Sequence, residues 1–165
     1  LMVSALIPSK NVGRGVEAIA RLPDVQLVVA GDGPLRADVQ QLADRLMPGR
    51  YHRLTVAPDA MPDLYRSADA FLHLSRDESF GNVYVEAMAC GIPVVAYDLP
   101  RTRWIVGDDA FLVRDDSLED LVRNLSEAMS SDARDRGSIE RARQFSWKSV
   151  ASSYRGFLQE VVSDR

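Results

Sequence analysis

The chain has 165 residues, 46% of them hydrophobic, which is enough for one globular domain with a substantial core. A net charge of −4 argues against a nucleic-acid-binding surface, and no apolar run reaches the roughly 18 residues of a membrane-spanning helix. Because Cys90 is the only cysteine, the chain can form neither a disulfide framework nor a cysteine zinc site, and a cytoplasmic setting is favoured. The only histidines are His52 and His73, and we predict no metal site.

Strand-like and helix-like segments alternate along the chain. In chain order we predict a strand at Met2–Ile7, a helix at Val12–Leu22, a strand at Val25–Ala30, a helix at Pro34–Leu46, a strand at Arg53–Ala57, a short helix at Met61–Ser67, a strand at Ala70–Leu74, a helix at Asn82–Cys90, strands at Ile92–Tyr97 and Ala110–Val113, and helices at Leu118–Met129, Asp132–Gln144 and Trp147–Val162.

This alternation predicts the α/β class: a three-layer Rossmann-like domain with a mostly parallel sheet of about six strands and helices on both faces. The fully apolar run Ile92–Tyr97 is typical of a central parallel strand. Right-handed crossovers gather the strand-to-helix loops at one edge, where ligands bind in such sheets. We expect these loops at Pro8–Val12, Gly31–Pro34, Pro58–Met61, Ser75–Asn82 and Asp98–Arg103.

Two carboxylates, Glu78 and Glu86, stand eight positions apart in the window Ser75–Ala96. Glu86 falls in the apolar segment Val83–Cys90, and a helix that is apolar on nearly all sides is buried. A buried carboxylate needs hydrogen-bond donors, so we interpret Glu86 as a ligand for sugar or ribose hydroxyls. A structural pair with an arginine or a backbone N–H is the alternative.

Glu78 precedes a tight turn that opens the next helix. It either binds sugar hydroxyls or remains a solvated charge in its charged loop. The helix start at Ser79–Val83 offers free N–H groups, a positive dipole end and the close backbone approach of Gly81, which together suit a phosphate or diphosphate. A plain helix N-terminus capped by Ser79 or Asn82 is the alternative.

The first strand-to-helix loop carries Lys10, which could neutralise a leaving phosphate; an ordinary surface lysine is the alternative. We interpret the Gly31–Pro34 segment mainly as turn and helix-start chemistry, with possible proximity of its backbone to a ligand. We interpret His73 as a satisfied core residue, and Trp104 and Trp147 as packing residues.

Together these residues resemble the C-terminal domain of retaining GT-B glycosyltransferases of family 4, over nearly the whole chain. The 75–96 window resembles that family's E-x7-E signature, with Glu78 and Glu86 in register. Three further segments are similar to the family's second strand and helix, to the approach to its signature and to its closing helix: VVAGDGPLRADVQQLADRL, DAMPDLYRSADAFLHLS and QFSWKSVASSYRGFLQEV.

The resemblance implies that residues 1–165 form a nucleotide-sugar-binding domain whose N-terminal, acceptor-binding neighbour lies outside this chain. It implies transfer of a hexose from a nucleoside-diphosphate sugar with retention of configuration, without a cofactor or bound metal, and with membrane association only through the missing domain or the acceptor. Glu78 and Lys10 would be catalytic and Glu86 would hold the ribose. The remaining donor-binding positions are Ser79, Phe80, Gly81, Asn82 and Val83 at the sugar and diphosphate, Gly31 near the ligand, and Val56, Ala57 and Pro58 at the base.

Two departures from the family pattern keep other functions open. Ala5 stands where the family usually has an arginine, and the nearby Arg14 is a candidate substitute. The segment DLPRTRW at residues 98–104 lacks the family's two glycines and Pro-Glu pair. A non-catalytic nucleotide-sugar-binding or assembly module is therefore one alternative function, and a nucleotide-sugar epimerase or hydrolase is another.

Overall fold

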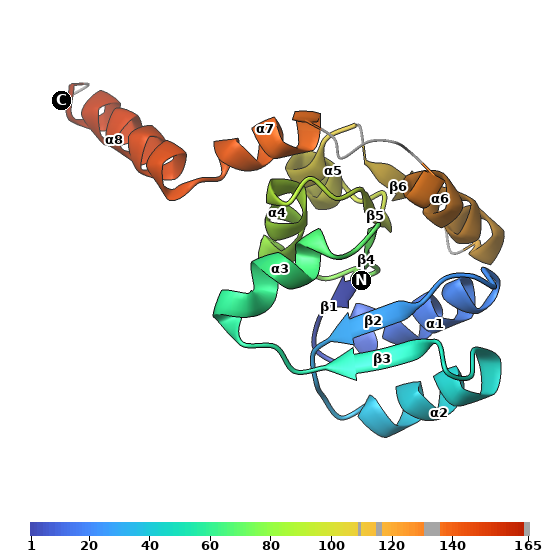
Figure 1. Cartoon of the computed structure of the whole chain (residues 1–165). Helices are drawn as coiled ribbons and strands as arrows, with labels where there is room; N and C mark the ends of the chain where they lie inside the picture. The colour runs from blue at the N-terminus through green and yellow to red at the C-terminus, as the bar shows by residue number, and fades with distance from the viewer. Residues whose placement is uncertain (109, 115–116, 131–135, 164–165) are drawn as a thin grey trace.

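The structure is a computed structural model that describes residues 1–108, 110–114, 117–130 and 136–163. Its elements follow the predicted alternation (Figure 1). They are β1 (Met2–Val3), η1 (Pro8–Lys10), α1 (Val12–Ala20), β2 (Leu27–Ala30), α2 (Arg36–Leu46), β3 (Tyr51–Leu54), η2 (Pro58–Ala60), α3 (Met61–Arg66), β4 (Phe71–His73), α4 (Asn82–Ala89), β5 (Val94–Tyr97), α5 (Pro100–Val106), β6 (Phe111–Val113), α6 (Leu118–Ser130), α7 (Arg136–Gln144) and α8 (Trp147–Ser163).

Three local predictions are wrong. The third strand begins two residues earlier than expected, because Tyr51 pairs with Leu27 of β2 and its ring is buried in the core. The segment after β5 is the helix α5 rather than a loop, with Pro100 in the first turn, where a proline is well tolerated. The first strand is only two residues long. The start of the helix predicted at Asp132–Gln144 lies outside the described residues.

The strands form two three-stranded parallel sheets, in the orders β1-β2-β3 and β4-β5-β6, where we expected one sheet. The two sheets adjoin, because the Leu72 N–H donates to the Leu1 carbonyl at 2.8 Å. The spatial order is therefore β3-β2-β1-β4-β5-β6, with all carboxyl ends at one edge. The predicted α/β class and Rossmann-like arrangement are confirmed.

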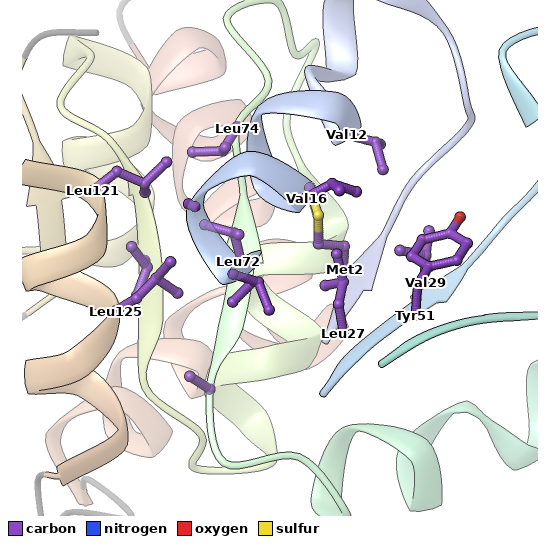
Figure 2. Close-up of a cluster of buried hydrophobic side chains, with 14 of the residues drawn as sticks. Met2, Val12, Val16, Leu27, Val29, Tyr51, Leu72, Leu74, Leu121 and Leu125 are labelled. Atoms are coloured by element: carbon purple, nitrogen blue, oxygen red, sulfur yellow. The ribbon is translucent and has the colours of Figure 1, made fainter. Parts of the chain in front are cut away.

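Helices cover both faces of the strands, and each face has its own hydrophobic core. Helices α1, α2 and α6 enclose the larger core, which contains Met2, Val16 and Leu72 and, from α6, Leu121 and Leu125 (Figure 2). Helices α3, α4 and α5 cover the other core, built around Tyr65, Phe71, Tyr84 and Met88. These two cores fix the loops at the carboxyl edge from both sides.

Helix α8 projects from the rest of the fold (Figure 1) and buries none of its side chains. The prediction that Trp147 is a packing residue is wrong, since 90% of it is exposed. Trp104 is also largely exposed, but its ring packs edge to face against Phe80 and Phe145. Among the described residues, no helix has both the length and the apolar character needed to span a membrane.

Candidate active site

The candidate site lies where the chain leaves β1 and β4, the adjacent strands of the two sheets. From β1 the chain continues to β2 on one side, and from β4 it continues to β5 on the other. A crevice outside the carboxyl ends of strands at such a switch point is the usual ligand position in open α/β sheets. Asn11 ties the two loops together, because its Nδ2 donates to the Leu74 carbonyl at 3.0 Å.

Glu78 is held by two donors at one carboxylate oxygen. Its Oε1 lies 2.5 Å from Lys10 Nζ and 2.6 Å from His73 Nε2. The side chains of Lys10 and Glu78 are only 17% and 18% exposed. Glu78 is therefore not a solvated loop charge, and Lys10 is not an ordinary surface lysine. Glu78 Oε2 has no hydrogen-bond partner among the described residues.

The lysine also organises the loop that carries Glu78. Its Nζ lies 3.4 Å from Ser75 Oγ and 3.4 Å from the Asp77 carbonyl. Ser75 Oγ in turn donates to the same carbonyl at 2.9 Å. The loop is thus built around one ammonium group, which presents Glu78 toward the crevice.

The environment keeps Glu78 ionised and His73 neutral. Burial alone would raise the pKa of Glu78, but the hydrogen bonds from Lys10 and His73, together with the charge of Lys10, hold the pKa below its usual value. Burial lowers the pKa of His73 and outweighs the opposing effect of Glu78. A neutral His73 facing a carboxylate must carry its proton on Nε2, because an unprotonated nitrogen could not donate.

Gly81 sets the start of α4. It has φ 88° and ψ 56°, a left-handed conformation, and a Cβ at this position would come within 2.7 Å of the Tyr84 ring. Among the described residues no side chain caps the helix, so the expected alternative of a Ser79 or Asn82 cap is wrong. The Tyr84 N–H donates to the Gly81 carbonyl at 3.0 Å, and no side chain among the described residues accepts from the N–H groups of Asn82 and Val83, as suits an anion site.

Glu86 lies on α4 but is exposed, so the expectation of a buried carboxylate is wrong. The helix buries Tyr84, Ala87 and Met88 and turns its other side outward. The Tyr65 hydroxyl donates to Glu86 Oε2 at 2.7 Å. Burial, and then this hydrogen bond to Glu86, raise the pKa of Tyr65, which therefore stays a donor.

A cavity of about 350 Å³ opens beside Glu78, within the size range of small-molecule sites. The loop before α4, the helix itself and α5 form its walls. Its lining residues are Ser75, Arg76, Asp77, Glu78, Phe80, Tyr84, Leu99, Pro100, Arg101, Thr102 and Ile105. A cavity of about 370 Å³ between the amino ends of β2 and β4 contains none of the predicted site residues.

Packing within the chain accounts for the glycine at position 31. A Cβ on Gly31 would lie 1.9 Å from the carbonyl oxygen of Ser4, the residue after β1, so the two backbone segments are too close for a side chain. The predicted base-binding positions Val56 and Ala57 follow β3, and Pro58 begins η2. Among the described residues no hydrogen bond joins these four positions to Lys10, Glu78 or Glu86.

The departures at position 5 and residues 98–104 have clear structural counterparts. Ala5 is exposed, and Arg14 Nη1 is paired with Glu17 Oε2 at 2.8 Å on the surface of α1. Arg103 Nη2 lies 2.7 Å from Asp98 Oδ2, across the start of α5. The loss of the two glycines thus accompanies a helix that forms one wall of the cavity.

Sequence reasoning missed two members of the site, His73 and Tyr65. The sequence favours a satisfied core residue at His73, yet its buried Nδ1 finds no partner among the described residues and its Nε2 contacts Glu78. The sequence feature that could have indicated the role of His73 is a polar ring inside an apolar strand. Among the described residues, no group of three His, Cys, Asp or Glu side chains could hold a metal ion.

The comparisons with known proteins agree with this architecture. The sequence profile described as "Glycosyl transferases group 1" matches residues 1–145. The chain is 34% identical to a D-inositol 3-phosphate glycosyltransferase of Mycolicibacterium smegmatis, over 90% of this chain and 37% of that protein. It is 31% identical to a GDP-mannose-dependent α-(1-6)-phosphatidylinositol dimannoside mannosyltransferase of Mycobacterium tuberculosis, over 87% and 39%. A glycosyltransferase structure from Rickettsia africae shares the fold, with a TM-score of 0.84 and 18% identity over 99% of this chain and 48% of that one.

Proposed function

This chain belongs to the family of glycosyl transferases group 1, and on that premise we propose that it is the donor-binding, C-terminal domain of a retaining GT-B hexosyltransferase of family 4. The chain spans 37% and 39% of the length of the two curated relatives. In this proposal an N-terminal domain binds the acceptor, and residues 1–165 bind a nucleoside-diphosphate sugar. A cytoplasmic setting and the absence of a cofactor are parts of the same proposal.

The observation that carries the proposal is the ion pair of Lys10 with Glu78 beside the uncapped start of α4. The N–H groups at the start of α4 would hold the diphosphate. Oε2 of Glu78 would accept from sugar hydroxyls, and Glu86 would accept from ribose hydroxyls. When the bond from the anomeric carbon to the phosphate oxygen breaks, its electron pair stays on the diphosphate, and Lys10 stabilises that added charge.

The names of the relatives support a nucleotide sugar as the donor. The mannosyltransferase from M. tuberculosis is described as dependent on GDP-mannose, and it matches 87% of this chain. We propose a nucleoside-diphosphate hexose for this protein, bound with its diphosphate at residues 79–83.

Calorimetric titration of the full-length protein with UDP-, GDP- and ADP-hexoses tests this function. We expect one of them to bind, and Glu86→Gln to weaken that binding about 10-fold, the effect of one lost hydrogen bond to a charged group. Glu127→Gln is the matched control, because Glu127 is an exposed glutamate on α6. Failure of every donor to bind to the folded protein would exclude the proposal.

A non-catalytic module is the second candidate function, and a specific observation favours it. Ala5 carries no positive charge where the family usually has an arginine, so Lys10 is the cation that follows β1 at the site. Arg14, the candidate substitute, is already paired with Glu17. Turnover of a donor by the wild-type protein would rule out this candidate. Activity that appears only in Ala5→Arg would support it.

A further inference from the structure

We propose that His73 is a positioning residue for Glu78: its Nε2–H fixes the carboxylate so that Oε1 is satisfied by the protein and Oε2 remains available to the substrate. This inference rests on the proposed function, because it takes Glu78 as the group that meets the donor sugar. His73 itself does not touch the substrate. It acts through Glu78, from the last residue of β4.

The surroundings of His73 hold its ring in one orientation. The residue is 1% exposed. Its ring stacks on Phe71 from the same strand, with centroids 6.0 Å apart and planes 10° apart. The ring of Tyr84 from α4 meets it edge to face at 5.0 Å. With rings on two sides, the Nε2–H vector is fixed toward the loop that carries Glu78.

A purely packing role does not account for an imidazole here. Its Nδ1 is buried with no hydrogen-bond partner among the described residues, and an unpaired buried polar atom is destabilising. A leucine would fill much of the same space without that cost. What the imidazole adds is the donor at Nε2, 2.6 Å from Glu78 Oε1.

The two donors on Oε1 differ in rigidity. Lys10 reaches Glu78 with a flexible four-carbon chain, whereas His73 is held by a strand and two rings. The rigid donor therefore sets the carboxylate plane, and the lysine supplies the charge. Without His73, Glu78 keeps its counter-ion but loses its fixed orientation.

Several titratable groups surround this imidazole. Glu78 faces it from the loop and Lys10 lies beyond the shared Oε1, on η1. The Tyr84 hydroxyl on α4 stays neutral, because burial raises its pKa to about 12. Near neutral pH the cluster therefore holds one ammonium, one carboxylate and a neutral imidazole.

Three substitutions of His73 distinguish a role as a hydrogen-bond donor from a role in packing alone. The side-chain nitrogen of glutamine can occupy the place of Nε2, that of asparagine corresponds to Nδ1, and leucine has neither. For the full-length protein with its donor, we expect kcat/KM of His73→Gln within about 3-fold of wild type. His73→Asn and His73→Leu should each lose about 10- to 100-fold, the effect of one hydrogen bond to a charged group, and the loss should lie mainly in kcat.

The pH profile distinguishes positioning from simple destabilisation. The acid limb of kcat/KM should move to higher pH in His73→Leu, because Glu78 loses a hydrogen bond that lowers its pKa, and should stay in place in His73→Gln. Equal activity of the Asn and Gln variants, or a Gln variant as impaired as the Leu variant, would overturn the proposal. A wild-type profile in His73→Leu would do the same.

Two measurements without substrate keep this inference separable from the proposed function. Histidine ¹⁵N spectra of the unliganded full-length protein should show His73 as the neutral Nε2–H tautomer near pH 7, with exposed His52 as the reference signal. Carboxyl ¹³C titration should show a higher pKa for Glu78 in His73→Leu than in His73→Gln. An Nδ1–H tautomer, or the same Glu78 pKa in both variants, would overturn the role of His73 even where donor binds. If these results hold and no donor binds, only the proposed function fails.

Discussion

Lys10 and Glu78 are 68 positions apart in the sequence, and their side chains meet at 2.5 Å between the carboxyl ends of β1 and β4. The contact joins the loops that follow two strands of different sheets. Because the two sheets adjoin through β1 and β4, the pair also links the two halves of the fold at the candidate site.

Removing the ammonium group should impair catalysis more than donor binding. Lys10→Met should lower kcat by about 10²- to 10³-fold, the loss typical of one group that stabilises a developing negative charge. Steady-state kinetics of the full-length protein measure it. Lys148→Met is the matched control, since Lys148 is the other lysine of the chain and is exposed on α8. An equal loss in both variants would contradict the role of Lys10.

The ionised state of Glu78 should make the protein less stable in acid. Its folded-state pKa lies below the usual 4.5, so its ion pair contributes stability above that pH, and the contribution is lost as pH falls through the folded pKa. The free energy of unfolding of wild type should exceed that of Glu78→Gln most clearly near neutral pH. Urea unfolding from pH 7 to pH 3 should show the difference shrinking; a constant difference would contradict this assignment.

Tyr65→Phe tests the hydrogen bond that holds Glu86. The substitution removes only the hydroxyl that donates to Glu86 Oε2, and should lower the free energy of unfolding by about 1 kcal/mol. We expect donor affinity to fall as well, because the carboxylate is no longer oriented. Calorimetry measures both effects. In the Glu86→Gln background the substitution should add little further loss of affinity; full additivity would show that Tyr65 acts separately.

The left-handed turn before α4 should require glycine for two reasons. Gly81→Ala should cost about 1–2 kcal/mol for its positive φ, and more because its Cβ would clash with the buried Tyr84 ring. Gly49→Ala is the matched control, because Gly49 also has a positive φ, 74°, but no atom of the described residues lies within 4 Å of its added Cβ. Thermal unfolding of both should show the larger loss for Gly81→Ala. Equal losses would mean that the Tyr84 contact is not important.

Much of the fold could be predicted from the sequence because its signals are local. Apolar runs and helical spacing placed nearly every element, whereas the strand order, which sets the switch point, comes from the structure. The break between the two sheets could not be predicted, because it depends on β1 pairing over only two residues. Helix α5 was missed, because Pro100 suits the first turn of a helix as well as a loop.

The candidate site could be predicted only in part. Lys10 and Glu78 were assigned to the correct edge from their loops, whereas the exposure of Glu86 depends on how α4 rotates against the strands. The roles of His73 and Tyr65 depend on contacts with residues five and 21 positions away, which sequence spacing alone does not specify.

The salt bridge at the switch point also has a consequence for how a donor arrives. The contact with Glu78 already holds the Lys10 ammonium, and the Lys10 side chain is only 17% exposed. In the proposed function, an incoming diphosphate therefore meets a lysine whose position Glu78 already fixes, and does not have to recruit a mobile side chain from water. The carboxylate thus orients the lysine before the donor binds, at the junction of the two sheets.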